Sequence, residues 1–97
     1  MAEVTIHPVA EVEYEHALAW YLDRSSRAAE RFEAAVGEAI DAIRSHPTMF
    51  PMCDDIHRFV LLKRYPYSLI YRFDGIAAHV IAVAHAKRRP ADWSSRA

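Results

Sequence analysis

The stretch Leu62-Lys-Arg-Tyr-Pro-Tyr-Ser-Leu-Ile-Tyr-Arg72 decides the fold of this chain, because it joins a chain reversal to a strand. Tyr65-Pro66 predicts the reversal, and residues 67–73 are rich in the aromatic and branched side chains typical of strands. Asp74-Gly75 then predicts a tight hairpin. Further strands are expected on either side, over residues 56–63 and 77–84. The second half of the chain is therefore predicted to form an antiparallel sheet.

The first half carries a short strand and two helices. Residues 3–7 alternate and include β-branched side chains, which predicts the strand. Pro8 suits the first turn of a helix, which we expect over residues 9–22. Ser25-Ser26 breaks that helix and can cap a second one, expected over residues 27–45. Two helices joined by so short a break are predicted to form an antiparallel hairpin.

These elements predict one α+β domain spanning residues 1–97, with the helical hairpin packed on one face of a mainly antiparallel sheet. The opposite face would then be open, and it is the natural place for a site. Side-chain alternation predicts which residues share a face. It places Tyr67, Leu69, Tyr71 and Phe73 on one face, Ser68, Ile70 and Arg72 on the other, and His79, Ile81, Val83 and His85 together on the next strand.

Charge is divided unevenly along the chain, although the net charge is only −1. Residues 1–55 hold eleven acidic and four basic side chains, for a charge of −7, and residues 56–97 hold two acidic and eight basic ones, for +6. This asymmetry indicates an acidic face and a basic face. Alternatively, an acidic helical layer simply covers a basic sheet. A domain of this size buries a limited core, so leftover apolar surface would suit a permanent partner.

Cys53 is the only cysteine, which excludes an internal disulfide and fits a reducing compartment. No basic side chain flanks it to lower the pKa of its thiol, so we interpret it as an ordinary loop residue. The sequence has neither a signal-peptide pattern nor an apolar run approaching the ~20 residues of a membrane helix. We therefore expect a cytoplasmic protein without a membrane partner.

The six histidines are spaced in no metal-binding motif, and the two glycines cannot build a phosphate-binding loop. We therefore expect no metal and no cofactor. His85 differs from the other histidines because it ends a strand beside Lys87-Arg88-Arg89. There it can act as a general acid or base, or contact a phosphate. The alternative is a strand-end histidine with a satisfied hydrogen bond.

Basic and aromatic side chains of the second half are the candidates for binding a target. They are Lys63, Arg64, Arg72, Lys87, Arg88, Arg89 and Trp93. Cations interleaved with aromatic rings suit a phosphate backbone or an acidic partner. Simpler interpretations stand beside this one, since a basic run is often a solvated cluster and Arg72 can reach water from the end of its strand.

Five segments, in this order, resemble the RelE/ParE superfamily of bacterial toxins from type II toxin–antitoxin modules. They are Ala17-Leu-Ala-Trp-Tyr21, Ala28-Ala-Glu-Arg-Phe32, His46-Pro-Thr-Met-Phe-Pro51, the stretch from Leu62 to Arg72, and Val83-Ala-His-Ala-Lys-Arg-Arg-Pro-Ala-Asp-Trp93. The resemblance covers nearly the whole chain. It implies a growth-inhibiting toxin, of the kind found in plasmid stabilisation, held in a hetero-oligomer by a cognate antitoxin. The antitoxin's flexible segment would fold onto the toxin.

The resemblance leaves two targets open, because one branch of the superfamily cleaves mRNA in the ribosome and the other poisons DNA gyrase. In a RelE-like endoribonuclease, His85 and Arg88 would be the catalytic residues, because cleavage needs proton transfer and stabilisation of phosphate charge. Ser68 and Trp93 depart from that branch, which tends to carry an arginine and a tyrosine near these positions.

The Arg-x-Pro-x-x-Trp ending looks more like the ParE branch. The pI of about 6.6 also disfavours docking on ribosomal RNA. We therefore expect a ParE-like toxin that binds DNA gyrase without catalytic residues of its own. A ribosome-dependent mRNA endoribonuclease is the alternative, and a toxin-derived interaction module without toxicity is the second.

Overall fold

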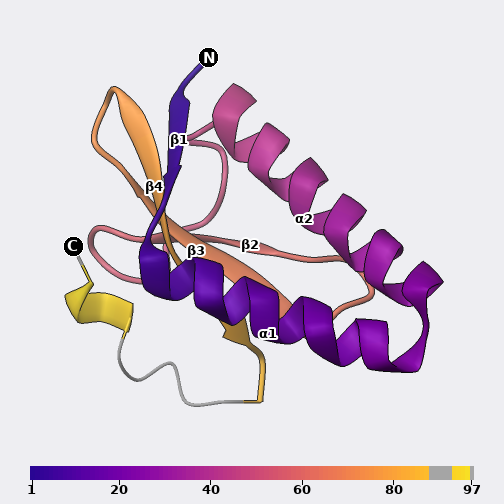
Figure 1. The fold of residues 1–97 in the computed structure, drawn as a ribbon. Helices are drawn as coiled ribbons and strands as arrows, with labels where there is room; N and C mark the ends of the chain where they lie inside the picture. Colours follow the sequence, from indigo (N-terminus) through magenta and orange to yellow (C-terminus); the bar gives the residue numbers. More distant parts are fainter. Residues whose placement is uncertain (88–92, 97) are drawn as a thin grey trace.

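The computed structural model describes residues 1–87 and 93–96, and its elements follow the predicted order (Figure 1). They are strand β1 (Glu3–Ile6), helices α1 (Pro8–Arg24) and α2 (Ser26–Ser45), strands β2 (Arg58–Leu61), β3 (Tyr67–Phe73) and β4 (Ala77–His85), and a 3₁₀ helix, η1 (Trp93–Ser95). The predicted α+β class is therefore confirmed. No helix in the described ranges is long and apolar enough to cross a bilayer.

The strands form one sheet in the order β1-β4-β3-β2. β3 pairs antiparallel with β2 and β4, whereas β1 runs parallel to β4. The predicted Asp74-Gly75 turn joins β3 to β4. Gly75 adopts a φ of 97°, which residues other than glycine rarely adopt. The sheet is thus mainly antiparallel, and its one parallel pair joins the first strand to the last.

Both helices cover the same face of the sheet and diverge from their tight connection (Figure 1). The imidazole of His7 accepts a hydrogen bond from the Val9 amide at 3.1 Å, and Pro8 takes the first helical position of α1. Ser25 caps α2, because its hydroxyl accepts from the Ala28 amide at 2.9 Å. These caps fix where each helix begins, close to the predicted boundaries.

The core lies between the helices and the sheet. Phe32 and Ile43 of α2 and Tyr71 of β3 are 0% exposed, so the centre of this layer is dry. The Phe32 ring contacts four tyrosine rings at centroid distances of 4.9 to 5.9 Å, and these belong to Tyr14, Tyr21, Tyr65 and Tyr67. Such ring pairs stabilise beyond their buried area. They hold α1, α2 and the start of β3 together.

The strand predicted over residues 56–63 is shorter than expected. The Asp54 carboxylate accepts hydrogen bonds from the Ile56 and His57 amides at 2.9 and 2.7 Å, which holds a turn where the strand was predicted to start. At the other end, Arg64 adopts a φ of 71°, a left-handed conformation incompatible with a strand. β2 is confined between these two turns.

A β-bulge in β4 overturns one predicted face assignment. Ile70 pairs with Ala82 and Tyr71 with Val80, so Ile81 is an extra residue on β4. Ile81 consequently packs in the outer cluster with Ile70, whereas Val83 packs in the core under the helices. The prediction that His79, Ile81, Val83 and His85 share one face is therefore wrong. The assignment for β3 is confirmed, since Leu69 and Tyr71 face the helices and Ile70 does not.

Asp74 connects the β3–β4 turn to β1 through the imidazole of His79. One carboxylate oxygen accepts from the Ile76 and Ala77 amides at 2.9 and 2.8 Å, and the other lies 2.8 Å from His79 Nε2. His79 Nδ1 in turn lies 2.7 Å from the Thr5 hydroxyl. The hydrogen bonds from Ala77, His79 and Ile76 hold the pKa of the Asp74 carboxyl well below its usual range.

Replacing Tyr71 by phenylalanine removes a buried hydrogen bond and should destabilise the fold. The Tyr71 hydroxyl donates to the Pro47 carbonyl at 2.6 Å, and burial raises the pKa of this tyrosine. We expect Tyr71→Phe to lower the free energy of unfolding in urea by about 1–3 kcal/mol. Tyr65→Phe is the matched control, because its hydroxyl makes no hydrogen bond in the described parts of the chain. Equal losses in the two variants would contradict the assignment.

Candidate functional site

The last residues of β4 have no neighbouring strand on one side. Pairing with β1 ends at Ile6 and Val80, and the His7 amide donates the last bond to the Val80 carbonyl at 2.8 Å. Because Pro8 then begins α1, the chain turns away and α1 packs along β4 instead. From Ile81 to His85, β4 is therefore an edge strand, where backbone groups are available to other partners.

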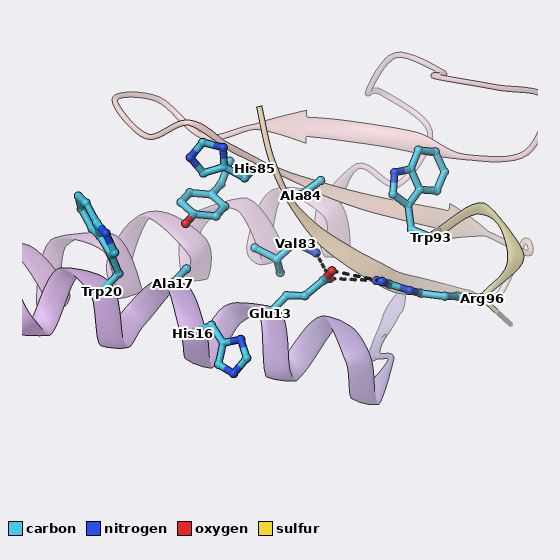
Figure 2. A pocket seen from close by; sticks show the side chains of 10 residues that line it. Glu13, His16, Ala17, Trp20, Val83, Ala84, His85, Trp93 and Arg96 are labelled. Atoms are coloured by element: carbon cyan, nitrogen blue, oxygen red, sulfur yellow. Dashed lines mark hydrogen bonds and ion pairs between the residues drawn. The ribbon is translucent and has the colours of Figure 1, made fainter. Parts of the chain in front are cut away.

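Glu13 and Arg96 occupy part of this edge (Figure 2). Glu13 Oε1 accepts from the Val83 amide at 3.0 Å and from Arg96 Nη1 at 2.9 Å, and Oε2 accepts from Arg96 Nη2 at 3.2 Å. Arg96 Nη1 also donates to the Ile81 carbonyl at 2.9 Å. This pair, the Glu13–Arg96 clasp, supplies the acceptor and donor that an adjacent strand would supply. It also ties the segment after η1 to α1.

A groove of about 220 Å³ lies between α1 and this edge of β4, and we call it the α1–β4 groove. Rings dominate its lining, together with the clasp and three small aliphatic side chains. The lining residues are Glu13, His16, Ala17, Trp20, Tyr67, Val83, Ala84, His85, Trp93 and Arg96 (Figure 2). The groove therefore combines apolar surface with imidazoles and a free strand edge, which are features of a binding site.

Trp20 is the most accessible large ring of the groove. It is 50% exposed, and the Arg24 guanidinium carbon lies 3.4 Å from its ring centroid. The Trp20 ring also makes an edge contact with the Tyr21 ring, at a centroid distance of 4.9 Å. A large ring held in place but left half in water is typical of a residue that anchors a partner.

His85 stands at the end of β4, inside the groove. Its Nδ1 accepts a hydrogen bond from the Lys87 amide at 3.0 Å, and its ring meets the Tyr67 ring edge-on at 5.0 Å. In the neutral imidazole the proton therefore lies on Nε2. His85 can therefore donate one hydrogen bond from Nε2, while Nδ1 is already bonded to the Lys87 amide.

Three of the predicted target-binding residues gather at one end of the sheet. Lys63 and Arg64 lie in the turn between β2 and β3, and Lys87 follows β4. The Ala86 amide donates to the Pro66 carbonyl at 2.7 Å, which brings these two turns together. We call Lys63, Arg64 and Lys87 the basic end. Arg88 and Arg89, which were predicted beside them, lie outside the described residues.

Arg72 and Trp93 lie elsewhere. Arg72 pairs with His79 near the opposite end of β3, so it does not join the basic end. Trp93 packs on the outer face of the sheet with Ile70 and Ile81, and its ring meets that of His57 at 5.1 Å. The expectation of an open outer face is therefore only partly met, because Trp93 covers part of it.

Among the groove residues that were not predicted as site residues from the sequence, four supply polar groups or an exposed ring. Glu13, His16 and Trp20 lie three or four residues apart along α1, on the face that Arg24 continues. That spacing places the three side chains on one face of the helix, which is a usable signal in the sequence. Arg96 has no local signal, because its partner Glu13 is 83 positions away.

The described residues place no three His, Cys, Asp or Glu side chains together as a metal site would require. Cys53 is exposed in the connector before β2. Partial burial and then the Asp54 charge raise the pKa of its thiol, which disfavours the reactive thiolate.

The side chains and backbone of the α1–β4 groove offer hydrogen bonding by the strand edge, ring contacts and cationic charge.

Removing the clasp should open the edge of β4. We expect Glu13→Ala to lower the free energy of unfolding by about 1–3 kcal/mol, because the Val83 amide loses its acceptor and the Arg96 guanidinium keeps only the Ile81 carbonyl. Amide hydrogen exchange at Val83 should accelerate roughly tenfold. Glu15→Ala removes an exposed carboxylate from the same helix and is the control. Unchanged exchange at Val83 in Glu13→Ala would show that the clasp does not protect the edge.

Comparison with known proteins places this chain in a family. The family model described as "ParE toxin of type II toxin-antitoxin system, parDE" matches residues 4–90. A solved structure titled "Chromosomal ParDE TA system from P. aeruginosa" contains a similar chain, with a TM-score of 0.64 and 15% sequence identity, covering 90% of this chain and 98% of that one. Among curated protein sequences there is no match. Because the family model spans nearly the whole chain, this protein belongs to the ParE toxin family of type II toxin–antitoxin systems.

Proposed function

We propose that this chain is a toxin neutralised by a cognate antitoxin, and that it acts by binding DNA gyrase rather than by catalysis. Membership of the ParE toxin family carries the proposal. The similar chain comes from a structure titled as a ParDE toxin–antitoxin system, which supports an antitoxin as partner. A toxin–antitoxin hetero-oligomer would be the resting form, and the free toxin the active one.

The polar groups of the groove favour binding over RNA cleavage. Cleavage needs a proton acceptor, a proton donor and a cation free to meet phosphate charge. His85 already accepts a hydrogen bond through Nδ1, and Glu13 holds Arg96, the only guanidinium that lines the groove in the described part of the chain. Ser68 of β3, paired with Ala84, brings no cation to the middle of the sheet.

The basic end is the surface that we assign to the target. Lys63, Arg64 and Lys87 are exposed at the same end of the sheet, next to the mouth of the groove at His85. Clustered cations speed association with an acidic surface and help to orient it. Arg72 is too far along β3 to belong to the same contact.

A second groove suits the antitoxin. It has a volume of about 390 Å³ and lies between the diverging helices over the sheet. Apolar side chains such as Ala10, Val36, Ile40 and Leu69 line it, and so does Ile6, which is 39% exposed. Exposed apolar surface on so small a domain favours a partner segment that folds onto it.

Induction of the chain alone in bacteria, with pulse-labelling of DNA and protein synthesis, tests the target. We expect DNA synthesis to fall first, and purified protein to inhibit supercoiling by gyrase while leaving ribosome-bound mRNA intact. Cleaved mRNA with an early fall in protein synthesis would instead identify a RelE-like endoribonuclease. If neither synthesis falters, the chain is an interaction module without toxicity. Co-expression with the antitoxin should restore growth.

Reversing charge at the basic end should weaken inhibition. We expect Lys63→Glu to raise the concentration needed for half-inhibition of gyrase roughly tenfold, because a repulsive charge replaces an attractive one. Arg44→Glu makes the same change of charge near the Asp74-Gly75 turn, at the other end of the sheet, and is the matched control. Equal effects would show that only net charge matters. Circular dichroism of both variants would establish that they fold.

A further inference from the structure

We propose that the Thr5 hydroxyl is a nucleophile, activated by His79 and Asp74, which takes the acyl group from a small acyl phosphate. The three side chains meet beside the turn that joins β3 to β4. None of them lines the α1–β4 groove or the groove between the helices, and none belongs to the basic end. The inference therefore holds whether or not the chain inhibits gyrase.

Neighbouring strands place the hydroxyl beside the imidazole. Thr5 of β1 is the register partner of His79 of β4, and Val4 packs toward the core, so Thr5 points to the outer face of the sheet. Thr5 Oγ1 lies 2.7 Å from His79 Nδ1, and His79 Nε2 lies 2.8 Å from Asp74 Oδ2. A hydroxyl, an imidazole and a carboxylate are thus connected in series, which is the arrangement that activates a nucleophile.

The Asp74 carboxylate decides which ring nitrogen of His79 carries the proton. A carboxylate only accepts hydrogen bonds, so in the neutral imidazole the proton lies on Nε2. Nδ1 is then an acceptor, and the Thr5 hydroxyl donates to it. Hydrogen bonds from the Ala77 amide, the His79 ring and the Ile76 amide lower the pKa of the Asp74 carboxyl, which keeps it ionised. His79 Nδ1 is therefore placed to take the hydroxyl proton.

Arg72 supplies a cation close to this hydroxyl. It opposes His79 on β3, and it shares the outer face with Ile70 two residues before it. Its guanidinium has no hydrogen-bond or ion-pair partner within residues 1–87 and 93–96. Thr5, His79 and Arg72 form a row across three strands, and neighbouring strands are about 4.8 Å apart. Arg72 can therefore hold the phosphate of a donor whose acyl carbon reaches Thr5.

The reaction transfers one acyl group and releases phosphate. Thr5 Oγ1 forms a bond to the acyl carbon while His79 Nδ1 accepts the hydroxyl proton. The bond from that carbon to the phosphate oxygen breaks, and its electron pair leaves with the phosphate. The imidazolium then gives its proton to the released phosphate, and an ester remains on Thr5. Because Thr5 is exposed, the surface offers a donor few contacts beyond charge, so the donor itself must be activated.

Acetylation of the full-length protein by acetyl phosphate tests the proposal, because the chain carries an internal control. Thr48 is the only other threonine; it is also exposed, and its hydroxyl has no partner in the described parts of the chain. Peptide mapping by mass spectrometry would give the rate at each threonine, and alkaline hydroxylamine would remove esters but not the amides formed on lysines. We expect Thr5 to react roughly a hundredfold faster than Thr48. Equal rates would overturn the proposal.

Asp74→Asn separates activation of the hydroxyl from its position. The asparagine keeps an oxygen for the Ile76 and Ala77 amides, but its NH₂ group donates to His79 Nε2 and moves the ring proton to Nδ1. The imidazole then cannot accept the hydroxyl proton. We expect the rate at Thr5 to fall roughly a hundredfold while the circular dichroism spectrum is unchanged. An undiminished rate at Thr5 would show that His79 does not activate it.

The charge of the donor is tested with p-nitrophenyl acetate, which is neutral. We expect Arg72→Gln to slow acetylation of Thr5 by acetyl phosphate roughly tenfold more than acetylation by the neutral ester. Arg44→Gln removes a guanidinium from α2, on the other face of the sheet, and is the control. Equal slowing with both donors would overturn the choice of an acyl phosphate. The two threonines of the unmodified protein decide the question of activation even if a variant does not fold.

Discussion

The rest of the structure depends on one constraint, which is that β1 pairs with only the first part of β4. β1 can follow β4 only from Glu3 to Ile6, because Pro8 commits the chain to α1. Five residues of β4 are thereby left without a neighbouring strand on the side away from β3, and α1 packs along them. A shortened strand thus creates an edge, a groove beside that edge and the need for the Glu13–Arg96 clasp.

Three surfaces of this small domain differ in shape and in charge. The groove between the helices is apolar and suits an antitoxin segment, whereas the basic end suits an acidic target surface. The α1–β4 groove opens beside the basic end, where the Lys87 amide donates to the His85 ring. Occupation of one surface can therefore influence access to the other through charge and simple proximity.

Local chemistry predicts most of the fold, since Pro8, Ser25 and Asp74-Gly75 act through neighbouring residues. The bulge at Ile81 escapes such reasoning, because a β-branched residue looks the same whether or not it is the extra one. Every face assigned beyond the bulge is then reversed, which is why Val83 was placed with Ile81. Glu13 and Arg96 meet only in the folded chain, so the sequence offers no local sign of their pairing.

The pairing of the first strand with the last has a consequence for synthesis. Thr5 and His79 are separated by 74 positions and Glu13 and Arg96 by 83, so the sheet and its clasp close the two ends of the chain on each other. Contacts this distant in sequence form last and slowly. A nascent chain in which residues 77–96 are still inside the ribosome has neither β4 paired nor the clasp formed. Completion of this fold is thereby deferred until Arg96 has left the ribosome.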